Sequence, residues 1–541
     1  MIITNFLHFT DLSALTKLLA ILCPIFLYGE IHFRLPFLKG RIFKKEPEII
    51  FDLPHRIESG HLPVLLLIKD SHLFPITLKN VTIRILSSSN KVLEKIMISE
   101  NIDINQKWFT KIYKIDLAKY TDQNLEVNCC AEIKLNHRTS LIVNDNYKGL
   151  SHKNFLVFVD SETIPGSPEW VWGDMHCHSS WTEDRVEFGV PAKNIYEIAN
   201  SMGISFCSLI DHSYDLDDLP DSMTETDPEL TTWYKSRRVI KSLNESHPDF
   251  LIIPGEELSV DNGLGENVHL GVLNCDRFFE GTGDGFENLS SIASEFHYAK
   301  VLEQLPENSL AFAAHPQAPP PFIQKLLIKR GGWNNWDAPN KLSGYQAMNG
   351  VLDDEFERGK REWIKLLLKG KHIYIFAGND SHGNFNRFRQ LKLPFLSLWE
   401  KNSQIFAEFR TGVKTSVDTG LDALVAKLKT GSVIVSNGPF IDLKLFADAD
   451  ESADIGATLK KLPHTAAISL ISSKYYGSLE KVKVFTGNFS QRKEVLQNEI
   501  RVSGYSADLE ISLPKLHNAG YLRAEIYTHK EKFALTNPVW F

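Results

Sequence analysis

Cysteine is scarce in this sequence, and this scarcity argues against a disulfide-framed protein. The 541 residues contain six cysteines, of which Cys129 and Cys130 are adjacent, and no two of them form a CxxC pair. Six cysteines in a chain of this length are no disulfide framework. The pattern therefore predicts a reducing, cytoplasmic compartment. Cys177 lies between two histidines, but alternate residues of a strand point to opposite faces, so we do not expect it to share their site.

The chain also lacks a hydrophobic run long enough to cross a membrane. The apolar stretch Leu18–Tyr28 has about half of the ~20 residues that a spanning helix needs, and Pro24 interrupts it. No Lys or Arg precedes Lys17, so the charged start of a signal peptide is missing. We expect residues 1–44 to contain a buried helix or one that contacts a membrane surface, with a cleaved signal peptide as the alternative.

An excess of positive charge is absent as well. The formal net charge is -8 and the isoelectric point is about 6.2, so no nucleic-acid partner is expected for the chain as a whole. Hydrophobic residues make up 43% and charged residues 23%, as in soluble globular proteins. A length of 541 residues predicts roughly three domains.

Three regions with different patterns follow the N-terminal segment. Residues 45–164 are expected to form a β-sandwich-like domain, because short β-branched and apolar runs alternate there with turn residues. Residues 165–440 alternate strands with helices, and residues 441–541 return to a β-rich pattern. The strand candidates in the first region include Pro63–Ile68, Val81–Leu86 and Leu125–Ile133.

The alternation in the middle region indicates a mostly parallel sheet, either closed into a barrel or open. The expected helices include Ala192–Met202 and Glu355–Leu368, and a glycine suited to a helix C-terminus follows each. The expected strands are Trp170–Met175, Phe206–Ile210, Phe250–Ile253, Val268–Leu273, Leu310–Ala314, Tyr345–Met348 and Ile373–Ala377.

Histidines and carboxylates follow or lie within nearly every one of these strands. In a parallel barrel the carboxyl ends of the strands form one rim, so residues far apart in the sequence converge there. A single histidine near a strand end is more often a hydrogen-bonded surface or core residue. Repetition at strand after strand favours a shared metal site instead. The residues concerned are His176, His178, Asp211, His212, Glu256, Glu257, His269, His315, Asp380 and His382.

The residue types indicate which metal chemistry to expect. Imidazole and carboxylate ligands without cysteine suit zinc, manganese or iron. His176 and His178 would share one face of a strand and could bind the same ion. Two ions about 3.5–4 Å apart can activate a bound hydroxide and polarise a substrate together, without a serine or cysteine nucleophile.

Five motifs, in order along the chain, resemble those of one known family. They are GDMHCHSSWTED, LIDHS, IPGEE, AAHP and GNDSHG, and together they resemble the PHP (polymerase and histidinol phosphatase) superfamily. The stretch Phe409–Phe440 and the terminal TNPVW are similar to the CehA/McbA-type branch of its metallohydrolases. The resemblance covers the chain from about Trp170 to the C-terminus and does not include residues 1–160.

This resemblance implies a fold and a set of ligands. The fold would be a distorted (β/α)7 TIM-like barrel, flanked by the β-sandwich-like and C-terminal β-rich domains, with two or three divalent ions. One ion would take His176, His178, Glu257 and Asp380, a second Glu257, His269 and His315, and a third His212, His382 and a carboxylate. For that carboxylate the family uses an aspartate, and Glu183 stands in its place here.

Further residues complete the expected site. Asp211, Glu257 and His382 are the candidate catalytic residues. Asn349 follows the sixth strand and is expected to line the pocket. Arg387 and Arg410 are expected to bind an anionic substrate, since guanidinium pairs bidentately with phosphate, with surface salt bridges as the alternative.

Three functions remain open at this point. The first is hydrolysis of a small phosphoester by a metal-bound hydroxide. The second is hydrolysis of a carboxylic ester or carbamate at a similar centre, on which named members of the CehA/McbA-type branch act. The third is a metal-stabilised binding module without turnover, although an open multinuclear centre argues against it.

Overall fold

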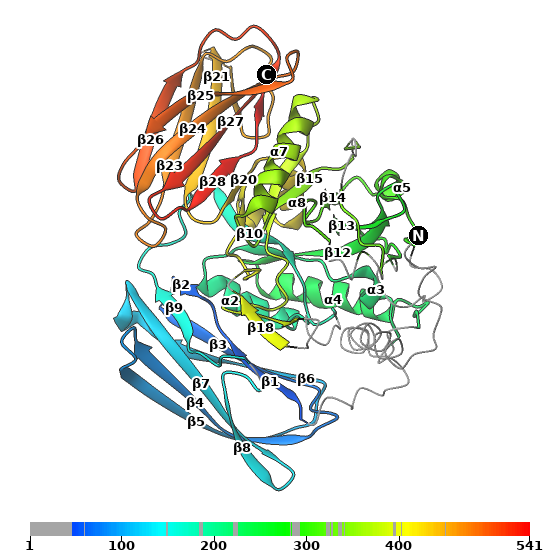
Figure 1. Cartoon of the computed structure of the whole chain (residues 1–541), viewed down its shortest axis with the longest axis vertical. Coiled ribbons are helices and arrows are strands. Elements are labelled where there is room, and N and C mark those ends of the chain that lie inside the picture. The colour runs from blue at the N-terminus through cyan, green and yellow to red at the C-terminus, as the bar shows by residue number, and fades with distance from the viewer. Residues whose placement is uncertain are drawn as a thin grey trace, which may run out of the picture.

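The computed structural model describes residues 46–541 apart from 59, 148–149, 183–187, 220–224, 282, 284–292, 321–324, 326–327, 334–337, 340, 393–396, 402 and 449–450. The apolar segment Leu18–Tyr28 and the candidate ligand Glu183 therefore lie outside the described residues. Strand accounts for 45% of the structure and helix for 16%. Within the described ranges, no helix is both long and apolar enough to cross a membrane. Figure 1 shows an N-terminal β-sandwich and a set of C-terminal sheets at opposite ends of the long axis, with a mixed region between them.

The N-terminal sandwich consists of two sheets that share one apolar core. A three-stranded sheet, β1-β3-β6, faces a six-stranded sheet, β2-β9-β7-β4-β5, in which β8 also pairs with β7. In β4, Val81, Ile83 and Ile85 are fully buried while Thr82 and Arg84 between them are not, as expected for a strand with one face on a core. The strands are β1 Glu48–Asp52, β2 Arg56–Ile57, β3 His61–Lys69, β4 Ile76–Ser87, β5 Val92–Ile104, β6 Trp108–Asp116, β7 Gln123–Leu135, β8 Arg138–Val143 and β9 Phe155–Val159.

The middle region contains seven strands that lie side by side in chain order, β10 to β16. They are β10 Trp170–Cys177, β11 Phe206–Leu209, β12 Leu251–Asp261, β13 Asn267–Leu273, β14 Leu310–Ala313, β15 Gly344–Asn349 and β16 Tyr374–Gly378. The helices are α2 Ile195–Ser201, α3 Ser213–Leu216, α4 Thr231–Ser246, α5 Tyr298–Gln304 and α7 Asp354–Leu368. In α7 the Asp353 side chain accepts hydrogen bonds from the amides of Glu355 and Phe356, so this helix begins at an N-cap.

The expected (β/α)7 barrel is wrong. β10, β11 and β12 are parallel neighbours, but β13 runs antiparallel to both β12 and β14. Only residues 262–266 join β12 to β13, and a connection this short permits a hairpin but not the crossover that parallel strands need. On its other side β10 pairs with the antiparallel strand β19, Arg410–Lys414, so the seven strands continue into a 14-stranded sheet. The chain is mostly β-sheet with few helices, and the alternation seen in the sequence does not correspond to seven parallel units.

The 14-stranded sheet runs from the middle region into the C-terminal region. From β19 it passes through β20 and β28 to β27, β24 and β25, with β29 beside β27, and a four-stranded sheet, β22-β21-β23-β26, packs nearby. Helix α8, Leu421–Thr430, precedes β20, and the hairpin β17-β18 precedes β19. The strands are β17 Phe388–Lys392, β18 Ser397–Lys401, β20 Val433–Ser436, β21 Phe440–Asp448, β22 Glu451–Asp454, β23 Thr465–Ile471, β24 Leu479–Asn488, β25 Lys493–Arg501, β26 Ser506–Ser512, β27 Gly520–Thr528, β28 Phe533–Thr536 and β29 Val539–Trp540.

The N-terminal sandwich forms hydrogen bonds with Phe385 and Asn386, which follow the last histidine motif. The carboxylate of Asp52 accepts a hydrogen bond from the amide of Phe385 at 3.1 Å. The side-chain amide of Asn386 donates to the carbonyl of Leu156 at 2.7 Å. Because both bonds join the sandwich to residues directly after the GNDSHG motif, the sandwich helps to hold that motif in place.

Candidate metal centre

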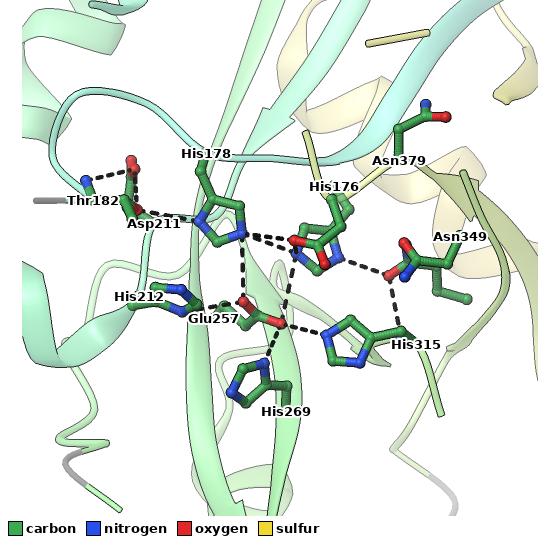
Figure 2. A network of polar contacts seen from close by, with 12 residues as sticks. His176, His178, Thr182, Asp211, His212, Glu257, His269, His315, Asn349 and Asn379 are labelled. Carbon is green, nitrogen blue, oxygen red and sulfur yellow. Dashed lines mark hydrogen bonds and ion pairs between the residues drawn. The ribbon is translucent and has the colours of Figure 1, made fainter. Parts of the chain in front are cut away.

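Six histidines and two carboxylates from widely separated segments meet at one point in the middle region. Figure 2 labels five of these histidines and Glu257. β10 carries His176, and His178 directly follows it; His212 precedes α3; Glu257 lies on β12 and His269 on β13. His315 follows β14, and Asp380 and His382 follow β16. These eight side chains were predicted from the sequence to share a site, and the structure brings all of them together.

Glu257 contacts five of the six histidines of the cluster. Its Oε1 atom lies 2.6 Å from Nδ1 of His269 and 3.0 Å from Nε2 of His315. Its Oε2 atom lies 3.2 Å from Nδ1 of His212 and 3.5 Å from Nε2 of His178. A single buried carboxylate therefore contacts rings from four different segments, an arrangement that suits a bridging ligand.

Asp380 approaches the same cluster from the opposite side. Its Oδ1 atom lies 3.4 Å from Nε2 of His176 and 3.3 Å from Nε2 of His178. Its Oδ2 atom accepts a hydrogen bond from the side-chain amide of Gln404 at 3.2 Å. His382 stacks on His178, with ring centroids 4.1 Å apart and an interplanar angle of 11°. His176 and His178 thus each contact both carboxylates, and Figure 2 shows their contacts with Glu257.

A buried aspartate outside the cluster joins two of its segments. Asp174 accepts hydrogen bonds from the amide of His176 at 3.1 Å and from the amide of Asn379 at 3.1 Å. Its second oxygen accepts from the Asn379 side chain at 2.7 Å. The strand that carries the first histidine pair is thereby tied to the residue before Asp380.

Neighbouring side chains determine which nitrogen of His176 carries a proton. Its Nδ1 atom lies 2.8 Å from Oε1 of Gln346, and that oxygen also faces the amide N–H of His315 at 3.5 Å. Since Oε1 can only accept, Nδ1–H of His176 donates to it. Gln346 is held in turn by donating to Oδ1 of Asn349 at 3.0 Å. The Nε2 atom of His176 therefore faces the two carboxylates, and it carries the lone pair when the ring is neutral.

The same reasoning applies to His178. Its Nδ1 atom lies 3.1 Å from Oγ1 of Thr182, and that hydroxyl donates to the carboxylate of Asp211 at 2.8 Å. The hydroxyl hydrogen is thus already used, so Oγ1 accepts the Nδ1–H of His178. Its Nε2 atom, like that of neutral His176, presents a lone pair to the cluster.

These lone pairs and carboxylates fit a bound cation. The Nε2 atoms of His176 and His178 lie 3.1 Å apart, and each is 3.3 to 3.5 Å from an oxygen of Glu257 or Asp380. Such acceptors repel one another at this distance unless a positive charge lies among them. Imidazole nitrogen and carboxylate oxygen are the ligands that zinc and similar ions use, and hydrogen-bonded Nδ1 atoms are typical of ligating histidines.

The pKa values of the cluster show the same preference for positive charge. Burial alone would lower the pKa of His176, but Glu257 and Asp380 outweigh it and raise that pKa to about 9. Without a bound cation, a proton on Nε2 therefore supplies the positive charge there, and a metal ion would take the place of that proton. Burial and the adjacent His382 hold the pKa of His178 well below its ordinary value. Despite their burial, the surrounding histidines hold the pKa values of Glu257 and Asp380 well below their usual range. Both carboxylates are therefore ionised and available as ligands.

The ligand atoms form four overlapping groups of three in which all atoms lie within 4.8 Å of one another. These groups are His176, His178 and Glu257; His176, His315 and Asp380; His212, Glu257 and His269; and His178, His212 and His382. The protein thus has buried clusters of histidine, glutamate and aspartate that could hold metal ions. These groups differ from the division between ions that the family resemblance implied, because His315 groups with His176 and Asp380, and His212 groups with Glu257 and His269.

Two of the candidate ligands have a strained backbone. His315 has a φ of 28° and Asp380 a φ of 52°, both in the left-handed region that residues other than glycine rarely adopt. Such strain is found most often where the surrounding structure holds a functional side chain in place. One edge of the cluster is also more open, because side-chain exposure rises from 0% at His176 to 15% at His212 and 19% at Asp380.

Some of the expected site residues lie elsewhere or have other roles. Asp211 was expected to be catalytic, but its oxygens accept four hydrogen bonds from Ser179 and Thr182, which leaves it positioning His178 through Thr182. Asn349 contacts Gln346 rather than a ligand. Glu183 lies outside the described residues.

The two arginines expected to bind substrate do not reach the cluster in this structure. Arg387 donates to the carbonyls of Lys153 and Asn154 in the N-terminal sandwich. Arg410 donates to the hydroxyl of Tyr476 and packs over an indole ring. Both guanidinium groups are buried at contacts between regions of the chain, a structural role that differs from the surface salt bridges considered as the alternative to anion binding.

Sequence reasoning missed several residues that shape the centre. They are Gln346, Thr182 and Gln404, which contact ligands, and Arg330, which contacts His269. Gln346 carried a usable signal, since it is a polar residue inside an otherwise apolar strand. Thr182, Gln404 and Arg330 lie in loops, where no periodic pattern marks them.

Comparisons with known proteins assign no family. No protein-family model and no curated protein matches the chain. A putative β-galactosidase from Bacteroides fragilis aligns with 91% of this chain and 73% of its own length, at 10% identity and a TM-score of 0.20. A Parabacteroides merdae β-glucuronidase aligns with 92% of this chain at 9% identity and a TM-score of 0.17. A trypsin-activated alpha-2-macroglobulin from Escherichia coli aligns with 92% at 9% identity and a TM-score of 0.15. The chain spans 64% and 23% of the length of these last two proteins, and similarity this low carries no argument about function.

Proposed function

We propose that this protein is a metal-dependent hydrolase, and that its substrate is a phosphoester. The observation that carries the proposal is the pair of Nε2 lone pairs of His176 and His178, which face each other between two ionised carboxylates. Fixed hydrogen bonds to Gln346 and Thr182 hold both rings in the ligating form. An arrangement that presents only acceptors to a buried point is suited to bind cations.

The eight clustered side chains would hold the ions, with Glu257 as the shared ligand. Divalent ions held there would polarise an ester oxygen and lower the pKa of a water molecule, which for zinc reaches about 7. The chain itself contributes rigidity and exclusion of water, since His176, His178 and Glu257 are at most 1% exposed. Low exposure strengthens every electrostatic interaction within the site.

Hydrolysis, with water as the nucleophile, is favoured because the neighbouring side-chain hydroxyls are already engaged in hydrogen bonds. Ser179 and Thr182 follow the first two histidines in sequence, and the hydroxyls of both donate to Asp211. With these hydroxyls engaged, water is the nucleophile that the arrangement favours. Asp211 is satisfied by four hydrogen bonds and acts as a positioning residue rather than as a general base.

The choice of a phosphoester over a carboxylic ester or carbamate rests on the motif resemblance to the PHP superfamily, and a paired assay tests it. Protein loaded with Mn²⁺ or Zn²⁺ would be given an aryl phosphate and an aryl carboxylic ester that release the same chromophore. We expect release from the aryl phosphate, loss of that activity on chelation, and its recovery when metal is restored.

Two substitutions serve as the matched pair for this assay. His176→Ala should lose bound metal and turnover together, while His137→Ala, at an exposed turn of the N-terminal sandwich, should retain both. Ester cleavage without phosphate release would favour the carboxylic ester or carbamate reading. Bound metal without turnover of either substrate would favour a binding module, and turnover that survives thorough chelation would exclude metal dependence.

A further inference from the structure

The loop that follows β14 returns to the metal cluster and is fastened to β13 there. The amide of Asn267 donates to the carbonyl of Lys329 at 2.9 Å, and the amide of Gly331 donates to the carbonyl of Asn267 at 2.8 Å. These two bonds form a parallel bridge between Asn267 and Arg330. The backbone of Arg330 is therefore placed beside the strand that carries the ligand His269.

Side chains secure the same loop on both sides of the bridge. The side-chain amide of Asn267 donates to the carbonyl of Ile328 at 2.6 Å. The indole N–H of Trp333, which is 2% exposed, donates to the carbonyl of His269 at 3.2 Å. Backbone groups, Asn267 and Trp333 thus fasten the loop at several points besides the guanidinium of Arg330.

The guanidinium of Arg330 lies against the imidazole of His269. Its Nη2 atom is 2.9 Å from Nδ1 of that ring, and its Nη1 atom contacts Nε2. Arg330 is only half-buried, and His269 is less deeply buried than His176 or His178. The arginine therefore lies on a more open side of the cluster, next to a candidate metal ligand.

We propose that Arg330 binds the anionic group of the substrate and so determines its class, namely the phosphoryl oxygens of a phosphomonoester. This inference rests on the proposed hydrolase function and deepens it. A guanidinium offers a planar set of donors that matches two phosphoryl oxygens, and its bonds to an anion are stronger than neutral hydrogen bonds. Neither Arg387 nor Arg410 is placed to do this, because both are buried at contacts away from the cluster.

The test compares Arg330→Gln with two other variants in the metal-loaded enzyme. Arg330→Lys retains the charge but not the planar pair of donors, and Lys329→Gln removes one positive charge from the neighbouring exposed position. Metal content is measured for each protein before any assay. We expect all three variants to fold and to bind metal like the wild type, because backbone groups, Asn267 and Trp333 still fasten the loop in each of them.

The kinetic readout separates a substrate contact from a structural role. For an aryl phosphate, Arg330→Gln should raise KM by about 10- to 100-fold, Arg330→Lys by less, and Lys329→Gln hardly at all. The effect on kcat should be smaller than that on KM, and turnover of a neutral aryl ester, where it occurs, should not change. An unchanged KM in Arg330→Gln, or an equal loss on both substrates, would overturn the proposal.

A binding measurement decides the matter even if the proposed reaction is wrong. Inorganic phosphate would be titrated into metal-loaded wild type and Arg330→Gln by calorimetry. Weaker binding to the variant by a similar factor supports the role of Arg330, whether or not any ester is hydrolysed. Equal binding to both proteins, or no binding to the wild type, would overturn it, while failure of turnover alone would count against the hydrolase proposal.

Discussion

Replacing Gln346 with leucine removes the acceptor that fixes the ring of His176, with little change in side-chain volume. Gln346 is fully buried and receives the Nδ1–H of His176 at 2.8 Å. In the variant this N–H has no partner, or the proton moves to Nε2 and the lone pair needed for metal binding is lost. Leaving a buried donor unpaired costs about 1–3 kcal/mol. At about 1.4 kcal/mol per factor of ten, metal affinity should fall about 5- to 150-fold.

Competition with a chromogenic chelator measures this change directly, and thermal unfolding shows whether the variant remains folded. Gln317→Leu is the matched control, because Gln317 donates to the hydroxyl of Tyr345 and not to a ligand. We expect this control to bind metal as the wild type does. Wild-type affinity in a folded Gln346→Leu protein would refute the assignment of the His176 tautomer and the role given to its second nitrogen.

Three further substitutions test other parts of the structure. Burial alone would raise the pKa of Glu408, but Lys532 outweighs it and lowers that pKa, so ionised Glu408 stabilises the fold above its unfolded pKa of about 4.5. This stabilisation is lost as the pH falls through the lower pKa that Glu408 has in the folded protein. The melting temperatures of wild type and E408Q should therefore converge in acid, and a difference that stays constant with pH would contradict this. In Gly378→Ala the new Cβ would lie 2.6 Å from Cβ of His176 and would displace that side chain. Metal binding in the same chelator assay should therefore weaken on the order of tenfold. Unchanged affinity would show that this close contact does not position His176. Arg523→Leu removes a buried cation that two glutamates share and should lower the free energy of unfolding in urea by about 3–5 kcal/mol; a loss below about 1 kcal/mol would show that the network contributes little.

The strands of the middle region could be located from the sequence because each is a short apolar run between turn residues. The expected strand Val268–Leu273 corresponds to β13, Asn267–Leu273, and the expected helix Glu355–Leu368 corresponds to α7, Asp354–Leu368. Apolar periodicity is a local property, so these elements appear close to where the pattern predicts them. Their direction relative to one another is not local, and the antiparallel placement of β13 was missed for that reason.

The ligand residues could be named from their types and their places near strand ends, but their supporting contacts could not. Asp211 has the same position after its strand as several ligands, yet its oxygens are used by backbone and hydroxyl donors. Arg387 has the charge to bind an anion, yet it packs against the N-terminal sandwich. Each case depends on which distant segment lies next to the residue.

By itself, the sequence determined the chemical character of the candidate site: histidines and carboxylates, without CxxC pairs, near the ends of short apolar strands. These are properties of residue type and of local spacing, which do not change when the chain folds. Tertiary structure alone decided that the strands join one large sheet instead of a barrel. It also decided that Gln346 and Thr182 fix the two histidine tautomers, and that Arg330 lies against His269. These features depend on pairing between segments far apart in the chain, and the free energy of such pairing comes from packing and buried hydrogen bonds that no single segment contains.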